Sequence, residues 1–261
     1  MEHTVTSPRV SVIIPVLDEA QNLPHILPYI PDLVDEVILI DGHSEDDTIG
    51  VARRLLATAI VMIQPNTGKG DALRYGIARS TGDIIVTLDA DGSADPREIP
   101  RFVDALLAGA DFSKGSRYLH GGGSDDITRL RSYGNRQLTR LVNILFRVHF
   151  TDLCYGYNAF WKESFNRLDI SDCHGFEIET ITTLRAIRAR LQITEVASYE
   201  HPRLNGASKL HAFADGWRIL RMIMHEWSSN PSGKLKAARF RKQNYMEEPT
   251  EPMAASKVAT E

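Results

Sequence analysis

The sequence predicts an α/β fold with a mostly parallel central sheet, because short apolar runs alternate with segments of helical composition. The apolar runs begin near Val10, Glu36, Ala59 and Gly82, and each has the length and composition of a buried strand. Such alternation favours parallel strands joined by right-handed crossovers. Three of the runs stop abruptly in acidic residues within the first 92 residues. Ligands bind at the carboxyl ends of strands in such sheets, so these acids are candidate site residues.

The segments between the runs carry helix and turn signals. Residues 22–33 have helical composition, but three prolines interrupt them, so the helix there should be short or irregular. The second strand ends in Asp41, and residues 46–48 can cap the helix that follows. The strand at 59–63 leads to Gly68-Lys69-Gly70, which opens another helix. Backbone N–H groups and an ammonium at such a turn suit an anion.

The apolar run that starts at Gly82 ends in Asp89-Ala90-Asp91, two carboxylates one residue apart. Residues two apart in an extended segment point the same way, so Asp89 and Asp91 could face one cleft. Two hard oxygen ligands suit Mg²⁺ or Mn²⁺, which complete their shells with water and substrate phosphates. A solvated turn is the alternative, since Asp and Gly are common turn residues. The other strand ends favour a metal site for a diphosphate.

These residues resemble the family 2 glycosyltransferases, most closely the branch of dolichyl-phosphate mannose synthases and bacterial polyprenyl-phosphate sugar synthases. The resemblance covers roughly Val10 to Lys209, and the order and spacing of its motifs are highly specific. The motifs are V-S-V-I-I-P-V-L-D-E, E-V-I-L-I-D-G-H-S-E-D-D-T, G-K-G-D-A-L, D-A-D with the following Pro96, G-S-R-Y from Gly115, and R-L-N-G-A-S-K-L from Arg203. The resemblance implies a Rossmann-like nucleotide-sugar-binding fold of the GT-A type, inversion at the anomeric carbon, and Mg²⁺ or Mn²⁺ bridging the donor diphosphate.

The resemblance also implies roles for individual residues. Asp91 is the main expected metal ligand, with Asp89 beside it and Ser93 or Asp95 completing the shell. Asp91, Arg117 and Asp152 form the expected catalytic set, because neutralising the departing nucleoside diphosphate is a large part of the work. The expected donor-binding residues are Pro15, Leu17, Glu19, Leu39, Asp41, Lys69, Asp89, Ala90, Asp91, Arg117, Arg203 and Lys209. The expected acceptor-binding residues are Arg131, Asp152 and Glu177.

Two departures from the family pattern leave the donor base and sugar open. Asp41-Gly42-His43-Ser44 replaces the usual Asp-Asp-Gly-Ser, and Leu17 replaces a tyrosine. The acceptor also stays open, with a polyprenyl phosphate ahead of a hydroxyl on a glycan or small metabolite. Only the hydroxyl strictly needs a general base, because a phosphate monoester arrives ionised. Asp152 is the first candidate for such a base, ahead of Glu177 and Glu179.

Two amphipathic helices are expected outside the strand-rich region. Residues 127–150 place apolar side chains among arginines, which suits a membrane surface and a protein core about equally. The second helix has apolar residues at alternating spacings of three and four, namely Leu210, Phe213, Trp217, Leu220, Met224 and Trp227. Packing of that face against the catalytic domain is the slightly favoured interpretation, with a bilayer interface as the alternative. The basic residues 234–242 could bind anionic lipid headgroups, and nothing else supports a nucleic-acid partner.

The composition fits a single catalytic domain with a C-terminal extension. The chain has 261 residues, 43% of them hydrophobic, and a net charge of −4, which permits one sizeable core. We expect an N-terminal tail at 1–9, the catalytic domain at 10–210, the amphipathic helix and basic extension at 211–245, and a disordered tail at 246–261. Without a signal peptide or a run of roughly 20 apolar residues, the expected location is the cytoplasm or the inner face of the membrane.

Overall fold

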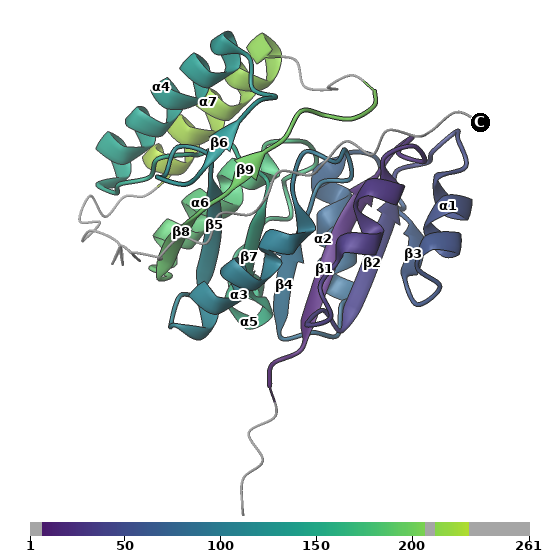
Figure 1. The fold of residues 1–261 in the computed structure, drawn as a ribbon. Coiled ribbons are helices and arrows are strands. Elements are labelled where there is room, and N and C mark those ends of the chain that lie inside the picture. Colours follow the sequence, from purple (N-terminus) through teal and green to yellow (C-terminus); the bar gives the residue numbers. More distant parts are fainter. Residues whose placement is uncertain (1–6, 207–211, 230–261) are drawn as a thin grey trace, which may run out of the picture.

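The computed structural model describes residues 7–206 and 212–229, and a seven-stranded sheet forms its centre (Figure 1). The strand order is β3-β2-β1-β4-β7-β5-β8. Neighbouring strands are parallel except where β7 pairs with β4 and β5. The sheet is therefore mostly parallel, as predicted. The strands are β1 (Val10–Val16), β2 (Glu36–Asp41), β3 (Ile60–Ile63), β4 (Ile84–Thr87), β5 (Phe112–Ser116), β7 (Asn158–Trp161) and β8 (Ile193–Ala197).

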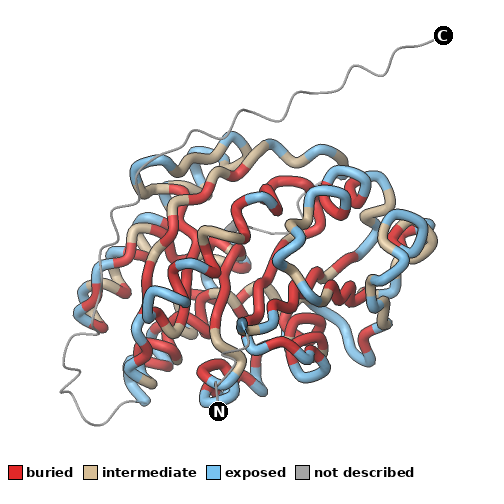
Figure 2. Tube along the Cα trace, turned by 60° about the horizontal axis from the view of Figure 1, so that its bottom comes forward, coloured by how far each residue is buried: buried red, intermediate tan, exposed pale blue. Residues whose placement is uncertain are grey.

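Helices cover both faces of the sheet, because the central strands are apolar on both sides. Ile13 and Ile85 pack into one core cluster with residues of α2, α4, α6 and α7, whereas Val12 and Val86 pack into a second cluster with residues of α1 and α3. Figure 2 shows buried backbone running through the middle of the molecule. The α-helices are α1 (Thr48–Leu55), α2 (Lys69–Arg79), α3 (Ile99–Leu107), α4 (Arg129–Phe146), α5 (Lys162–Asn166), α6 (Ile178–Arg188) and α7 (Ala212–Ser228).

Short elements connect these layers. The proline-rich segment 22–33 forms two 3₁₀ turns, η1 (Leu23–His25) and η2 (Leu27–Tyr29), and each has a proline in its first turn. The irregular structure predicted there is confirmed. A third 3₁₀ turn, η3 (Pro96–Glu98), leads into α3. A small separate sheet pairs β6 (Gly123–Ser124) with β9 (Tyr199–Glu200), and Glu200 also bridges to Ala94.

Helix α7 packs beside α4 and against α6, at one end of the sheet (Figure 1). Its inner face carries Ile219 and Ile223, together with Glu226, which pairs with Arg185 and Arg188 of α6. The stripe predicted from spacing lies on the opposite side. Four of its five described members, Phe213, Trp217, Met224 and Trp227, are 81%, 62%, 42% and 45% exposed, and Leu220 is half-buried. The preference for packing this stripe on the catalytic domain is wrong, because ion pairs and two isoleucines anchor the other face.

The predicted end of the catalytic domain at residue 210 lies outside the described residues, as do the basic extension after residue 229 and the tail from residue 246. Within the described residues, no helix is long and apolar enough to cross a membrane.

Helix α2 lies unusually close to the sheet at Gly76. A Cβ atom there would come within 2.6 Å of Ile13 Cγ2 and 3.0 Å of Ile40 Cγ1, and both isoleucines are fully buried. Close approach of α2 to β1 and β2 therefore requires a glycine. This close packing holds the start of α2, with Lys69, at the carboxyl edge of the sheet.

We expect opposite effects from alanine at two helical glycines. Gly76→Ala should lower the free energy of unfolding by about 1–3 kcal/mol, because overpacking outweighs the better helix propensity. Gly134→Ala in α4 should raise it by about 1 kcal/mol, since a Cβ there meets nothing within 4 Å. Urea unfolding of both variants measures the difference. Two changes of the same sign would contradict the packing of α2.

Candidate active site

A cavity of about 330 Å³ opens at the carboxyl ends of β1, β2, β3 and β4. Eight of the residues predicted to bind the donor or metal line it: Pro15, Leu17, Glu19, Lys69, Asp89, Ala90, Asp91 and Arg203. Val16, Gly42, Gln64, Thr67, Gly68, Ala72 and Phe176 complete the wall. The parallel strands bring together segments that range from residue 15 to residue 203, so the strand order creates this cavity. We call it the donor cavity, after the residues expected to bind the donor.

Each aspartate of the D-A-D motif is paired with a cation from a distant part of the chain. Lys69 Nζ lies 2.6 Å from Asp89 Oδ1, and Arg203 Nη2 lies 2.6 Å from Asp91 Oδ2. The Ser93 N–H donates to Asp91 Oδ1 over 2.9 Å. The two carboxylates therefore lie at the carboxyl edge of the sheet, each paired with a cation.

The glycine turn before α2 holds Lys69 firmly. Gly68 has a φ of +104°, and a Cβ atom there would collide with the carbonyl oxygen of His174. The Gly70 N–H donates to that same oxygen over 3.0 Å. Lys69 Nζ also contacts Glu179 Oε1 at 2.5 Å. Burial alone would lower the pKa of Lys69, but the two carboxylates outweigh it and raise that pKa above its usual value.

The residues present fit a divalent metal that takes much of its shell from the substrate. Within residues 7–206 and 212–229, no group of three or more His, Cys, Asp or Glu side chains could by itself hold a metal. Mg²⁺ commonly uses one or two carboxylates together with waters and substrate phosphates, which Asp91 and Asp89 can satisfy. Asp95 is not placed to help. Its carboxylate accepts from the Arg97 N–H and pairs with the Arg97 guanidinium.

Arg117 and Asp152 form a buried ionic group away from the donor cavity. Arg117 Nε donates to Asp152 Oδ2 over 2.7 Å, and Arg117 Nη1 lies 3.0 Å from Glu200 Oε2. Asn135 Nδ2 donates to Asp152 Oδ1 over 2.8 Å. Burial alone would raise the pKa of Asp152, yet Arg117 outweighs it and holds that pKa below its usual value. The role of Asp152 as a general base stays a prediction, and its burial and its bonds to Arg117 and Asn135 do not favour it.

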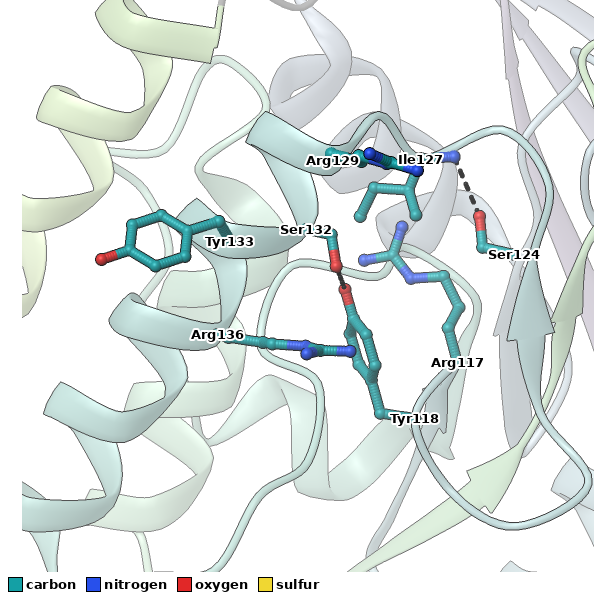
Figure 3. Close-up of a pocket in the computed structure, with 8 residues that line it drawn as sticks. All are labelled: Arg117, Tyr118, Ser124, Ile127, Arg129, Ser132, Tyr133 and Arg136. Carbon is teal, nitrogen blue, oxygen red and sulfur yellow. Dashed lines mark hydrogen bonds between the residues drawn. The ribbon is translucent and has the colours of Figure 1, made fainter.

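A second cavity, of about 450 Å³, lies between Arg117 and the start of α4. Figure 3 shows Arg117, Arg129 and Arg136 reaching toward it around Tyr118. The Tyr118 hydroxyl lies 2.9 Å from Ser132 Oγ, and the Arg136 guanidinium stacks 5.0 Å from the centre of the Tyr118 ring. The remaining lining residues are Ser124, Ile127, Ser132 and Tyr133. This arginine cavity is suited to an anion.

The expected acceptor contacts at Arg131 and Glu177 are not at the arginine cavity. Arg131 lies outside its lining, with its guanidinium 3.8 Å from Asp126. Glu177 sits under α7, where it accepts from the Gly175 N–H and lies 3.6 Å from Arg218. Both acceptor contacts stay predictions, and long-range contacts between elements decide where these two side chains point.

Among the described residues, the donor predictions Leu39, Asp41 and Arg117 lie outside the lining of the donor cavity. Leu39 belongs to the buried core on the α1 and α3 side of the sheet, so its burial does not favour the predicted contact with the donor. Asp41 is buried beneath the cavity and accepts from the N–H groups of His43 and Ser44 through Oδ2. Its Oδ1 has no hydrogen-bond partner among the described residues. Lys209 lies outside the described residues.

Sequence reasoning missed Gln64, Phe176 and Glu200 as site residues. Gln64 follows β3 just as Asp41 ends β2, so the rule about carboxyl ends of strands could have found it. Phe176 lines the donor cavity from the loop before α6, and the Lys69 ammonium lies 5.9 Å from its ring centre. Glu200 pairs with Arg117, and no sequence signal marked it.

Comparison with known proteins settles the family. The family model described as glycosyl transferase family 2 matches residues 11–169. The chain belongs to this family. This glycosyltransferase is 30% identical over 243 residues to the polyprenol monophosphomannose synthase of Mycolicibacterium smegmatis, covering 88% of this chain and 90% of that protein. It is also 30% identical over 235 residues to glycosyltransferase AglJ of Haloferax volcanii, covering 87% and 75% respectively.

Solved structures confirm the predicted GT-A fold. Glucosyl-3-phosphoglycerate synthase of Mycobacterium tuberculosis, in complex with Mn²⁺, UDP-glucose and phosphoglyceric acid, superposes with a TM-score of 0.69. The sequence identity is 23%, and the match covers 85% of this chain and 80% of that one. The same enzyme in complex with Mg²⁺ and UDP also gives a TM-score of 0.69, at 22% identity. Family membership makes this chain an enzyme that transfers sugars from nucleotide donors.

We expect Asp152→Asn to destabilise the enzyme by about 3 kcal/mol at pH 7, because it leaves Arg117 partly uncompensated in a buried place. The depressed pKa of Asp152 means that its ionised form stabilises the fold above the usual value of 3.8. That contribution is lost as the pH falls through the lower folded-state pKa. Urea unfolding at pH 7 and at pH values below about 4 should show the variant and wild type converging in acid.

Asp104→Asn is the matched control, since Asp104 is exposed on α3. It should leave the free energy of unfolding nearly unchanged. A mild effect of Asp152→Asn at pH 7 would show that the ionic group does not hold Arg117 in place.

Proposed function

We propose that this enzyme transfers a sugar, with inversion, from a UDP- or GDP-sugar to the phosphate of a polyprenyl phosphate. The observation that carries the proposal is the arginine cavity. Arg129 and Arg136 line it beside Tyr118, and a phosphate monoester is the anion that two guanidiniums recognise well. The polyprenol monophosphomannose synthase of Mycolicibacterium smegmatis, to which the chain is 30% identical, supports this acceptor class.

The donor end of the proposal rests on the D-A-D cavity. Asp91, with Asp89 beside it, would hold Mg²⁺ or Mn²⁺, and Ser93 is placed next to Asp91 through its N–H. A bound metal would supply positive charge to the diphosphate as it leaves. Arg203 and Lys69 reach into the same cavity and would add their charge to the departing group. Solved structures of the same fold contain Mn²⁺ with UDP-glucose or Mg²⁺ with UDP.

The state of the nearby carboxylates favours a phosphate over a hydroxyl as the attacking group. Asp152 is locked to Arg117, and Glu179 is locked to Lys69. Glu177 accepts from a backbone N–H beneath α7. Asp152 and Glu179 are thus engaged in ion pairs, while Glu177 keeps one buried oxygen, Oε2, without a hydrogen-bond partner among the described residues. A phosphate monoester needs none of them, because it arrives ionised.

A second candidate is transfer to a hydroxyl of a small phosphorylated metabolite. The structural neighbour from Mycobacterium tuberculosis was solved with phosphoglyceric acid. The arginine cavity could hold the phosphate of such an acceptor in the same way. This alternative then requires a base for the hydroxyl, which is the reason it ranks second.

The exposed face of α7 supports peripheral contact with a membrane that carries anionic lipid. Phe213 and Trp217 project from α7, and Tyr133 and Ile144 are 65% and 75% exposed on the neighbouring helix α4. Exposed arginines, Arg140 and Arg221 among them, accompany these side chains on the two helices. Aromatic and aliphatic groups flanked by cations suit the headgroup region of an anionic bilayer. Such a surface would also present a lipid acceptor near Arg129 at the start of α4.

The acceptor is tested by incubating the enzyme and Mn²⁺ or Mg²⁺ with radiolabelled UDP- and GDP-sugars, with and without a short polyprenyl phosphate. We expect label in the organic phase only when the lipid is present, from one of the donors. A parallel reaction contains phosphoglyceric acid in place of the lipid. Label in a water-soluble product of that reaction, and none in the lipid, would instead support the second candidate.

Variants of two arginines sharpen the same assay. Arg136→Gln should reduce lipid labelling at least about tenfold and leave donor binding intact, because it removes a guanidinium from the arginine cavity. Arg167→Gln is the control, since Arg167 is exposed at the end of α5 and outside both cavities. Equal activity of the two variants would sink the assignment of the arginine cavity to the acceptor.

Membrane contact is tested with the double variant Phe213→Ser, Trp217→Ser. Its affinity for phosphatidylglycerol vesicles should fall by roughly tenfold per residue, because each exposed aromatic side chain loses its burial in the interface. Co-sedimentation measures the change. Leu107→Ser provides the control, since Leu107 is 55% exposed on α3, away from α4 and α7. Unchanged vesicle binding by the double variant would rule out this face as the contact.

A further inference from the structure

The aspartate proposed to hold the metal is already neutralised by the chain itself. Arg203 Nη2 lies 2.6 Å from Asp91 Oδ2, and the two side chains are only 22% and 11% exposed. The other carboxylate oxygen, Oδ1, accepts from the Ser93 N–H over 2.9 Å. Both oxygens of Asp91 are therefore engaged. A metal ion at Oδ2 would lie against the guanidinium, and repulsion between the two cations would favour displacement of Arg203.

The neighbouring pair between Lys69 and Asp89 is built differently. Lys69 Nζ is also held by Glu179 at 2.5 Å, and its side chain is 13% exposed. This lysine has a second carboxylate that retains it whatever binds Asp89. Arg203, in contrast, makes its one close carboxylate pair with Asp91 among the described residues, and its Nε is buried without a hydrogen-bond partner there. The arginine therefore has both an exchangeable partner and an unused donor.

The backbone around Arg203 stays close to Asp91 independently of the ion pair. The His201 N–H donates to the Ser93 carbonyl over 2.7 Å, and the Leu204 N–H approaches the Asp91 carbonyl at 3.4 Å. The Arg203 N–H donates to Asp126 over 3.3 Å. These bonds allow the side chain to change partner by rotation alone, while the segment that carries it remains in place.

We propose that Arg203 is an internal substitute for the divalent metal. Without metal it neutralises Asp91 and keeps the carboxylate oriented toward the donor cavity. When a metal–nucleoside diphosphate complex enters, the metal takes over Asp91 and the guanidinium, with its unused Nε donor, turns to the diphosphate oxygens. This inference rests on the proposed function, because it requires the metal to bind at Asp91.

The exchange makes metal and nucleotide binding mutually dependent. Metal alone repels the guanidinium from Asp91 and leaves it in the cavity without an anion. Metal with diphosphate provides that anion, so each ligand strengthens the other by the same factor. Coupling of this kind commonly changes affinities by roughly 5- to 150-fold. Arg203 is thus a positioning residue that makes the enzyme select metal-loaded donor over free metal.

The test measures Mn²⁺ affinity by titration calorimetry and by the Mn²⁺ spin-resonance signal, without nucleotide and with UDP or GDP. Arg203→Gln should bind Mn²⁺ alone about tenfold more tightly than the wild type, because Asp91 is freed. The same variant should bind UDP or GDP more weakly in the presence of Mn²⁺. Arg203→Lys, which keeps the charge, should return Mn²⁺ affinity toward the wild-type value.

Arg54→Gln is the control, because Arg54 forms a 2.7 Å pair with Asp47 on the exposed surface of the enzyme. It should leave both affinities unchanged. If wild type binds Mn²⁺ with UDP or GDP but Arg203→Gln binds Mn²⁺ alone no better than wild type, the substitute role of Arg203 is overturned while the metal site stands. Absence of Mn²⁺ binding under every condition would overturn the metal site itself, and the role of Arg203 with it.

Discussion

Two carboxylates one residue apart repel each other, and the architecture of the donor cavity compensates that repulsion. Asp89 and Asp91 follow a buried strand, and each obtains a cation from a different part of the fold. Asp89 obtains Lys69 from the start of α2. Glycines in and before this helix allow it to approach both the sheet and the loop at His174, and this brings Lys69 to Asp89. Arg203 comes from a segment that runs beside Ser93. The cavity therefore exists as an ionic arrangement before any ligand arrives.

The segment after β8 links the two cavities. Glu200, in β9, pairs with Arg117 at the arginine cavity, and Arg203, three residues later, pairs with Asp91 at the donor cavity. The bridge between Glu200 and Ala94 keeps this segment next to the D-A-D motif. Both ends of the proposed reaction therefore border one short stretch of backbone. A donor and an acceptor held at two ends of one segment would gain part of the orientation that such a transfer requires.

Most residues expected at the donor share one cavity, whereas those expected at the acceptor do not, for a physical reason. Residues that line the donor cavity, such as Asp91, stand at the ends of strands, and local patterns determine where a parallel strand ends. The role of Asp152 depends on Arg117, and that of Arg117 depends on Glu200, which lies 83 residues further along the chain. Local spacing carries no information about such pairs. Family spacing also identified Arg203, whose partner Asp91 could not be inferred from either segment alone.

Helix α7 also shows that a local pattern predicts an element but not its long-range contacts. Its period correctly predicted a helix with an apolar stripe, yet the stripe faces outward because Ile219, Ile223 and Glu226 determine the packed side. A helix with apolar residues on two sides has two possible inner faces, and the buried pairs of Glu226 with Arg185 and Arg188 select one. The face that remains exposed is then available to a lipid surface.

The central claim is that Asp91 holds a divalent metal together with the diphosphate of the donor. It is tested most directly by a crystal structure of the enzyme with Mn²⁺ and UDP or GDP, with the metal located from its anomalous scattering. The account predicts an anomalous peak within bonding distance of the Asp91 carboxylate, with the diphosphate on the other side of the metal. A peak elsewhere, or a nucleotide bound outside the cavity between β1 and β4, would contradict it.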